Sequence, residues 1–459
     1  MNLIANVSIF ILLFGMTCCK PKSGDTNQLT SKKNKSLPIE IPNVFPQEGL
    51  TDAHTIIANG RLYLFGGHDQ SWDTDDTWRM DRWEIRSTDN LIDWKKEGVI
   101  LPTETYIGDL PNCWAGDITE RNGKYYWYFS NRNISTGVMV ANSPIGPFTD
   151  ALGKPLLPNG IIGKGHPYDP EIFEENGVYT MFFGAGHYYS VILGDDMISL
   201  AEKPQPVIVT TKDGKDKWTA DKSTVFKRND IYYLAWGANY AMSKQLRGPY
   251  IYEGDFLAGG HNNVFQWNGQ WYVVTENKDI SLFYRGVSLK PLFFNEDGTI
   301  DVPDDDADYP NIGRDWTFKH SKMGWNSLSG GTLDWKVGSV SGNIEGHTVI
   351  ESSNWLITDL TKCKHLVLQL KNNSRSTQAR ISLALFNPKK GKYWSNPEID
   401  WSQETQYDLD ISSNDTDFKE YQIDLSQNMN LKSSLKRIRI EPALGVNTGS
   451  WEIKYIGFK

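Results

Sequence analysis

Short runs of alternating aromatic and aliphatic residues recur along the first two thirds of the chain, each directly after an Asn-Gly or Asn-Asp pair. Asn-Gly accepts a positive φ at both central positions of a tight turn, and a period of two is that of a strand. Each run therefore predicts the second strand of a β-hairpin. The five runs are "ANGRLYLFGG" at 58–67, "RNGKYYWYFS" at 121–130, "ENGVYTMFFG" at 175–184, "RNDIYYLAWG" at 228–237 and "WNGQWYVVTE" at 267–276.

Five such hairpins predict a five-bladed β-propeller over residues 38–302. Companion pieces such as "STDNLIDW" at 87–94 and "NSPIGPF" at 142–148 are typical of outer strands and turns. A four-stranded meander cannot bury both of its faces alone, so repeated meanders stack around an axis. A β-sandwich is the alternative for these residues, but five aromatic hairpins fit blades better.

The pattern changes from about residue 315 to alternating strands without the Asn-Gly signal. Examples are "HLVLQLKNN" at 365–373 and "SWEIKYIGF" at 450–458, and Pro and Asp are frequent in the expected linker at 303–314. Strands with long connections are typical of a β-sandwich, here of jelly-roll type, over residues 315–459. The predicted fold class is therefore all-β: a five-bladed propeller followed by a sandwich.

The first residues look like a targeting segment. Leu3 to Met16 is mostly apolar, too short to span a bilayer as a mature helix, and is followed by Cys18 and Cys19. It resembles a bacterial lipoprotein signal at residues 1–19, followed by a polar, flexible tether at 20–37. An ordinary secretory signal is the alternative, since the start lacks Lys and Arg. We expect a lipid anchor to the membrane of a bacterial cell envelope, in the outer membrane or periplasm.

Composition excludes several classes of function. The net charge is −9 and no long basic run follows residue 36, which argues against nucleic-acid binding. Only Cys113 and Cys363 remain beyond the signal, in different predicted domains, so no disulfide framework is expected. No CxxC or HExxH motif indicates zinc. Aromatic residues make up 12% of the chain and either fill sheet cores or stack on apolar faces of ligands.

Acidic residues recur in the segment that leads into each hairpin. Asp52, Asp117, Asp169 and Asp221 lie five to eight residues before their turns, and His261 has the equivalent place before the fifth. The inner strands of a propeller face a shared channel, so these side chains should converge. Converging carboxylates push their pKa values apart, which provides the acid and the base that glycoside hydrolysis needs. Calcium binding is the other use of such a cluster, and a single Asp there usually caps a turn.

Residues 45–302 resemble a family 43 glycoside hydrolase, a five-bladed propeller with inverting catalysis. The resemblance implies that Asp52 is the general base, that Asp169 tunes and orients the acid, and that Arg285 contacts substrate. It also implies that His261 helps to hold a central ion or water, with calcium as the structural metal and no cofactor needed for the chemistry. It is carried by "TDAHTIIANGRLYLFGGHD" at 51–69, "CWAGDITERNGKYYWYFS" at 113–130, "YDPEIFEENGVYTMFFG" at 168–184, "GGHNNVFQWNGQWYVVTE" at 259–276 and "YRGVSLKPLFFNEDGTI" at 284–300.

One departure from the family concerns the general acid. The family has Glu followed by Gly-Pro, whereas this chain has Asp221 followed by Lys222 and Ser223. We expect Asp221 to be the acid, facing Asp52 across the pocket, with Glu276 and Glu171 as substitutes. The expected substrate contacts are His54, His68, Asp69, Trp114, Asp117, His166 and Arg285. His187 is a further candidate for the pocket lining, and Trp72, Trp78 and Trp218 are further candidates for stacking on a sugar.

The predicted function is that of an inverting, exo-acting glycoside hydrolase. It would release terminal sugars from an oligosaccharide or polysaccharide, as a β-xylosidase or α-L-arabinofuranosidase does. The alternative is a non-catalytic, glycan-binding surface lipoprotein with a degenerate propeller site. The C-terminal region resembles carbohydrate-binding jelly rolls, although a sandwich that only packs against the propeller is the other interpretation.

Overall fold

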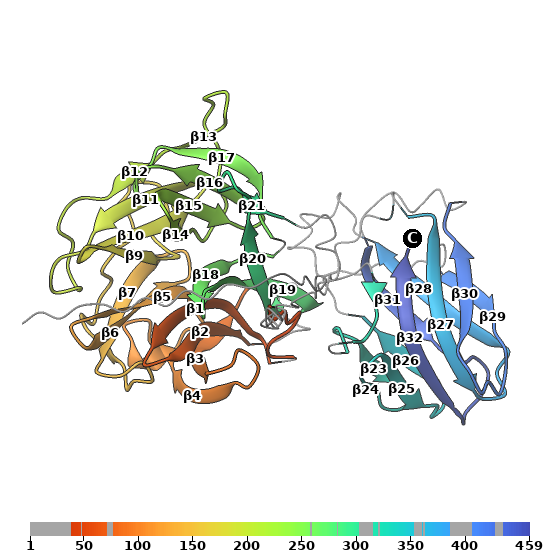
Figure 1. Ribbon diagram of the computed structural model, residues 1–459. Coiled ribbons are helices and arrows are strands. Elements are labelled where there is room, and N and C mark those ends of the chain that lie inside the picture. Colours follow the sequence, from red (N-terminus) through yellow and green to blue (C-terminus); the bar gives the residue numbers. More distant parts are fainter. Residues whose placement is uncertain are drawn as a thin grey trace, which may run out of the picture. The chain divides into compact units, whose positions relative to one another are not determined.

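A computed structural model describes residues 38–46, 48–70, 77–257, 259–281, 283–302, 315–319, 322–352, 360, 363–385, 406–426 and 435–459 (Figure 1). The predicted signal peptide, tether and linker, as well as Trp72, lie outside these residues, so the predicted domain boundaries stay predictions. Among the described residues, no helix has the length and apolar character that crossing a membrane requires.

Five antiparallel sheets of consecutive strands form the first part of the described chain. The first sheet holds β1 (Leu50–Ala58), β2 (Arg61–Asp69), β3 (Met80–Thr88) and β4 (Lys95–Ile100), and the second holds β5 (Cys113–Arg121), β6 (Lys124–Asn131), β7 (Ser135–Ala141) and β8 (Thr149–Asp150). The third holds β9 (Glu171–Glu175), β10 (Val178–Ala185), β11 (His187–Ile192) and β12 (Gln205–Val207). The fourth holds β14 (Thr224–Arg228), β15 (Ile231–Trp236), β16 (Asn239–Ser243) and β17 (Tyr250–Asp255), and β13 (Val209–Thr210) pairs in parallel with β17. The fifth holds β18 (Asn262–Trp267), β19 (Gln270–Ser281), β20 (Tyr284–Phe294) and β21 (Ile300–Asp301), and a short 3-10 turn, η1 (Pro102–Glu104), follows β4.

The predicted Asn turns connect the first two strands of every sheet. Each Asn has the left-handed backbone that the turn requires, with φ between 48° and 55°. These residues are Asn59, Asn122, Asn176, Asn229 and Asn268. The five hairpins predicted from the sequence are thus confirmed.

The second strand of each sheet is apolar on both faces, because its alternate residues pack against different neighbouring sheets. In β2, Leu62 and Leu64 pack in a core with residues of the fifth sheet, whereas Tyr63 and Phe65 pack with residues of the second. Three further clusters join the second sheet to the third, the third to the fourth and the fourth to the fifth. Each sheet is therefore buried on both faces between two neighbours, and burial of one such side chain stabilises the fold by roughly 1.5–3 kcal/mol.

The first strands of the five sheets form a closed ring, in which β1 contacts β5, β5 contacts β9, β9 contacts β14, β14 contacts β18 and β18 contacts β1. A ring of first strands with sheets radiating from it is a five-bladed propeller. This ring brings together the segments that carry the recurrent acidic residues.

The remaining strands form a β-sandwich. Its first sheet has the order β24-β25-β32-β27-β30, with β22 paired to β32, and its second has the order β23-β26-β31-β28-β29. Their core contains three buried Trp residues, Trp316, Trp325 and Trp451. The predicted fold class is therefore confirmed. The strands are β22 (Asp315–Trp316), β23 (Asn326–Ser329), β24 (Asp334–Lys336), β25 (Ser339–Asn343), β26 (Val349–Glu351), β27 (His365–Asn373), β28 (Gln378–Leu385), β29 (Gln406–Asp410), β30 (Lys419–Asp424), β31 (Leu435–Glu441) and β32 (Ser450–Phe458).

Candidate active site

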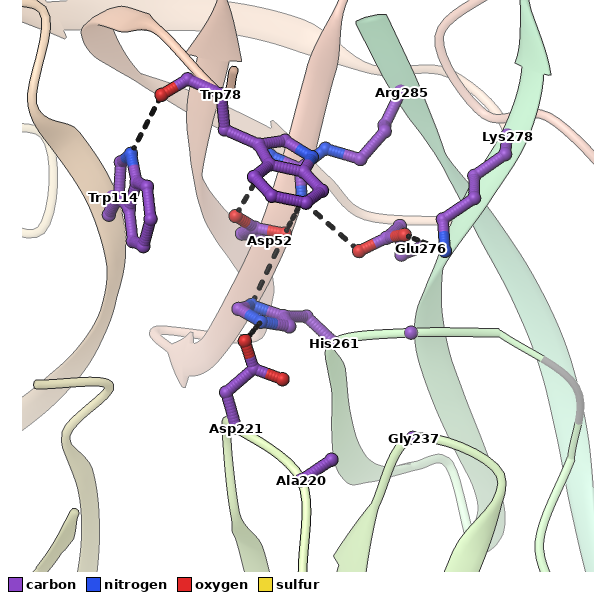
Figure 2. A pocket seen from close by; sticks show the side chains of 11 residues that line it. Asp52, Trp78, Trp114, Ala220, Asp221, Gly237, His261, Glu276, Lys278 and Arg285 are labelled. Atoms are coloured by element: carbon purple, nitrogen blue, oxygen red, sulfur yellow. Dashed lines mark hydrogen bonds and ion pairs between the residues drawn. The ribbon is translucent and has the colours of Figure 1, made fainter. Parts of the chain in front are cut away.

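A pocket is lined by residues of the first strands β1 and β5, of the loops before β14 and β18, and of β19 and β20 (Figure 2). Carboxylates and cations line it together with two indole rings. The lining residues are Asp52, Trp78, Trp114, Ala220, Asp221, Gly237, Gly260, His261, Glu276, Lys278 and Arg285. The chain positions of these residues span most of the propeller, so only the closed ring assembles them.

Asp52 occupies a break in the regular pairing of β1. The pairing with β2 shifts between Thr51 and His54, and Asp52 has a φ of 51°. Such a bulge redirects a side chain, which here lines the pocket. The carboxylate is 3% exposed and accepts hydrogen bonds from both Nη atoms of Arg285, at 3.0 and 3.3 Å. A positioned, paired carboxylate beside a cavity can act as a general base.

Arg285 connects Asp52 to two further carboxylates. Its Nε and Nη2 donate to Asp69 at 3.0 and 2.9 Å, and its Nη1 donates to Glu276 at 3.1 Å. Burial raises the pKa of Asp69 to about 6, although Arg285 opposes this shift. Arg285 lines the pocket as predicted, whereas Asp69 is fully buried and does not. The prediction that Asp69 contacts substrate is wrong, because its carboxylate is engaged in holding the guanidinium.

His261 lies between three carboxylates. Its Nδ1 is 3.2 Å from Oδ1 of Asp52, and its Nε2 is 3.7 Å from Asp169 and 4.0 Å from Asp221. Burial lowers the pKa of the ring, but the charges of Asp52, Asp169 and Asp221 outweigh burial and raise the pKa to about 10. His261 is therefore a central cation at neutral pH.

The raised pKa of His261 predicts a pH-dependent stability. The folded pKa of about 10 lies above the ordinary value of 6.5, so the folded state retains a proton that the unfolded chain releases. This contribution is fully present below pH 6.5 and should be lost as the pH rises towards 10. Urea unfolding between these limits, together with NMR titration of the ring assigned by the His261→Gln spectrum, measures it. Titration of the His261 signals near the ordinary value would contradict the assignment.

Asp169 lies behind the pocket wall. It is fully buried, and no described group forms a hydrogen bond with either of its carboxylate oxygens. Burial raises its pKa to about 7, with Asp221 and Asp52 adding to the shift and His261 opposing it. It is not among the residues that line the pocket, but its charge is coupled to those of His261 and Asp221.

Asp221 lies on the opposite side of the His261 ring from Asp52 (Figure 2). Its side chain is 52% exposed and lines the pocket. Burial works to raise its pKa, but the nearby His261 ring, 4.0 Å away, outweighs burial and lowers it. Asp221 therefore has the access that a proton donor needs, while His261 favours its ionised form in the ligand-free protein.

Neither predicted substitute acid is suited to donate a proton. Glu276 lines the pocket, but Lys278 and Arg285 overcome burial and lower its pKa to about 2. Glu171 does not line the pocket and accepts a hydrogen bond from Lys222 at 2.8 Å. Asp221 is thus the pocket carboxyl that remains for this role among the described residues.

A second layer of side chains lies one strand period further along the first strands. His54 and Glu171 follow Asp52 and Asp169 by two residues, and Nδ1 of His54 is 3.6 Å from Glu171 and 3.0 Å from Asp117. The three are buried, and none lines the pocket. The predictions that His54 and Asp117 contact substrate are therefore wrong. Asp117 follows a register shift in β5 and belongs to this layer, rather than to that of Asp52.

The remaining predicted residues have separate positions. Trp114 lines the pocket, and its Nε1 donates to the carbonyl of Trp78 at 3.2 Å. His68 is buried against Asp81, with Nδ1 at 2.9 Å, and His166 is exposed; neither is among the residues that line this pocket, and their contact with substrate stays a prediction. His187 and Trp218 pack edge to face outside the pocket lining, with ring centroids 5.2 Å apart.

Two pocket-lining residues, Lys278 and Trp78, are identified by the structure and not by the sequence. Lys278 follows Glu276 by one strand period and therefore shares its face of β19, a spacing from which its place in the pocket could have been predicted. Its Nζ lies 3.1 Å from Glu276. Trp78 was only one of several Trp residues in the sequence, and no pattern there distinguishes it from the others.

The calcium ion implied by the family resemblance does not fit the described side chains. Calcium takes six to eight oxygen ligands. In one of the two candidate groups, Nζ of Lys222 lies 2.8 Å from Oε2 of Glu171, and in the other one of the three ligands is an imidazole nitrogen, whereas calcium binds through oxygen. The first group thus already contains a cation, and the second offers two carboxylates and one imidazole. The two groups are His54, Asp117 and Glu171, and Asp169, Asp221 and His261.

Comparisons with known proteins agree with this fold and site. The chain matches the model of glycosyl hydrolases family 43 over residues 41–300. An arabinoxylan arabinofuranohydrolase of Paenibacillus polymyxa is 26% identical over an alignment of 318 residues, and the match covers 54% of this chain and 49% of that enzyme, so this chain spans about half its length. A xylosidase/arabinosidase of Bacteroides ovatus is 25% identical over 318 residues, covering 56% of this chain and 95% of that enzyme.

A solved structure supports the fold. The GH43_1 enzyme from Xanthomonas citri, complexed with xylose, has a TM-score of 0.52 and 20% sequence identity, and the match covers 58% of this chain and 93% of that one. The family match includes the first strands of all five blades and therefore every segment that contributes to the pocket. Since it also spans more than half of the residues, the chain belongs to family 43 of the glycosyl hydrolases.

Proposed function

We propose that the protein is an inverting, exo-acting glycoside hydrolase that releases terminal sugars of the β-xyloside or α-L-arabinofuranoside type. The observation that carries this proposal is the pair of carboxylates, Asp52 and Asp221, that line one pocket from opposite sides of His261. Two carboxylates with different surroundings are what glycoside hydrolysis requires. Membership of the family supports the hydrolase class, and the names of the relatives support the class of sugar.

In the proposed mechanism, Asp52 accepts a proton from a water molecule, whose oxygen attacks the anomeric carbon. The bond to the leaving oxygen breaks as the carboxyl of Asp221 donates a proton to it. The result is one free sugar of inverted configuration and one alcohol. Inverting enzymes hold the two carboxyls roughly 6.5–9.5 Å apart to admit the water. Each proton transfer is assigned to a side chain, so these steps need no cofactor.

Positive charges set the starting state of this reaction. Arg285 holds the Asp52 carboxylate by two hydrogen bonds and keeps it oriented. His261 favours the ionised form of Asp221, so the proton donor must be loaded from solvent through its exposed side. The rings of Trp78 and Trp114 offer apolar surface against which a sugar face can stack.

The alternative, a glycan-binding protein without catalysis, is not favoured. A binding site needs only aromatic rings and hydrogen-bond partners, whereas this pocket retains both carboxylates and the cations around them. Measuring turnover of a glycoside distinguishes the hydrolase from the glycan-binding protein.

A panel of aryl β-xylosides, α-L-arabinofuranosides and β-galactosides tests the proposal. We expect turnover of at least one member and of the matching oligosaccharide from its non-reducing end. Proton NMR of the first-formed sugar should show the inverted anomer before mutarotation. Binding of the sugars without turnover would support the glycan-binding alternative, and a retained anomer would refute the mechanism.

Two features outside the propeller remain proposals. The sandwich has a polar surface pocket whose lining includes Asn343, Lys371 and Asn373, and such side chains support a role in binding sugar hydroxyls. The apolar and cysteine-containing start of the sequence supports a lipid anchor in a bacterial envelope.

A further inference from the structure

Lys222 is fully buried at the centre of the propeller. Its Nζ donates hydrogen bonds to Oε2 of Glu171 at 2.8 Å, to the carbonyl of Pro170 at 3.0 Å and to the carbonyl of Ser223 at 2.9 Å. An ammonium has three protons to donate, so its hydrogen-bonding capacity is complete. A lysine is almost never fully buried unless it is paired in this way, and these contacts therefore indicate a built position.

The partners of Lys222 flank the two carboxyls of the proposed acid apparatus. Asp221 precedes Lys222 directly, while Pro170 and Glu171 directly follow Asp169. The side chain thus joins the segment that carries Asp221 to the segment that carries Asp169. The amide of Val225 reinforces this link by donating to Oε1 of Glu171 at 3.1 Å.

The backbone at Lys222 is held in an unfavourable region. Its φ is 50°, in the left-handed region that favours glycine. A lysine at this position has two energetic costs: a strained backbone and a charge buried away from water. The compensating interaction is the ion pair between its ammonium and the buried carboxylate of Glu171.

We propose that Lys222 is a positioning residue for Asp221 and that its ammonium replaces a metal cation in the cluster of His54, Asp117 and Glu171. By docking on Glu171 and Pro170, it fixes Asp221 at the pocket wall without calcium. This inference rests on the proposed function insofar as Asp221 is the acid, but the replacement of a metal can be tested without turnover.

Lys222→Met and Lys222→Gly test the positioning role, because Met keeps the volume and Gly suits the backbone. With unactivated oligosaccharides, kcat/KM should fall about 100-fold, the loss that a misplacement of 1 Å causes. Aryl glycosides with good leaving groups need no proton and should lose at most a few-fold. Calorimetry with the released sugar should show unchanged affinity. Lys227→Met is the matched control and should behave as the wild type, because Lys227, in the blade that follows Lys222, also pairs with a carboxylate of the third blade, Glu175, but is partly exposed.

Calcium and chelator provide the second readout. Thermal unfolding of the wild type should be the same in EDTA and in millimolar calcium, whereas calcium should raise the unfolding temperature of Lys222→Met, which leaves Glu171 and Asp117 without their cation. If the single variants fail to fold, the double variant Lys222→Met/Glu171→Gln removes both charges and should fold. It should retain the selective loss with unactivated substrates and show no response to calcium.

The kinetic experiment and the calcium experiment can each contradict a different part of the proposal. Equal loss with both kinds of substrate, or none, would overturn the positioning role. EDTA sensitivity of the wild type, or a Lys222→Met variant that ignores calcium, would overturn the replacement of a metal. Absence of turnover in the wild type would refute the proposed function and with it the positioning role, while the calcium arm would still be decided.

Discussion

Replacement of Asp52 by Asn is expected to lower kcat/KM by about 10²–10⁴-fold, the usual loss when a general base is removed. An amide of nearly the same shape cannot accept the proton of the attacking water. The loss should be similar for activated aryl glycosides and for natural linkages, because both require the same nucleophile. Initial rates with both kinds of substrate measure it.

The fold should survive this change. Arg285 keeps Asp69 and Glu276 as partners, so its buried guanidinium does not become unpaired. Circular dichroism and calorimetric sugar binding should therefore remain close to those of the wild type. Asp89→Asn is the matched control, since Asp89 is an exposed carboxylate of the same blade, paired with Arg61. Wild-type turnover by Asp52→Asn would place the base elsewhere.

Replacement of Asp221 by Asn should have an effect that depends on the leaving group. Natural linkages leave as alkoxides and need a proton, so their hydrolysis should slow by about 10²–10⁴-fold. Activated aryl glycosides should slow far less. A plot of log kcat/KM against the pKa of the leaving group should be steeper for the variant than for the wild type.

Asp221→Glu separates reach from chemistry. The longer side chain restores the residue that the family has at this place, and the pocket side of Asp221 is open. If the short side chain limits proton transfer, this variant should match or exceed the wild type with natural linkages. A leaving-group dependence unchanged in Asp221→Asn would show that Asp221 is not the acid and would strengthen the glycan-binding alternative.

The agreement between sequence and structure is best where the signal is local. The Asn-Gly turn takes a positive φ at both central residues, and the following strand must bury both faces, so "ANGRLYLFGG" predicts its hairpin without help from distant residues. The count of hairpins then predicts the number of blades. The predicted convergence of Asp52, Asp169, Asp221 and His261 is confirmed by their contacts around one imidazole ring.

The error about Asp117 shows where counting along the chain fails. Its distance from the turn resembles that of the other acids, but a shift of register in β5 changes which side-chain layer a position joins. His54 follows Asp52 by two residues, but the pairing of β1 with β2 shifts between Thr51 and His54, so His54 lies in the deeper layer. Register shifts depend on pairing with the next strand, and a single segment does not reveal them.

The sequence by itself determined the repeated hairpins, the two kinds of β-domain and the residues that supply the carboxylates, because these follow from short-range turn chemistry and alternation. Only the tertiary structure decided which charges neutralise one another. Arg285 reaches Asp52 across 233 positions, and Lys222 reaches Glu171 across 51. Such pairs form because a closed ring of strands buries charges that must then find partners within a few ångströms, and that requirement acts on distances in space rather than along the chain.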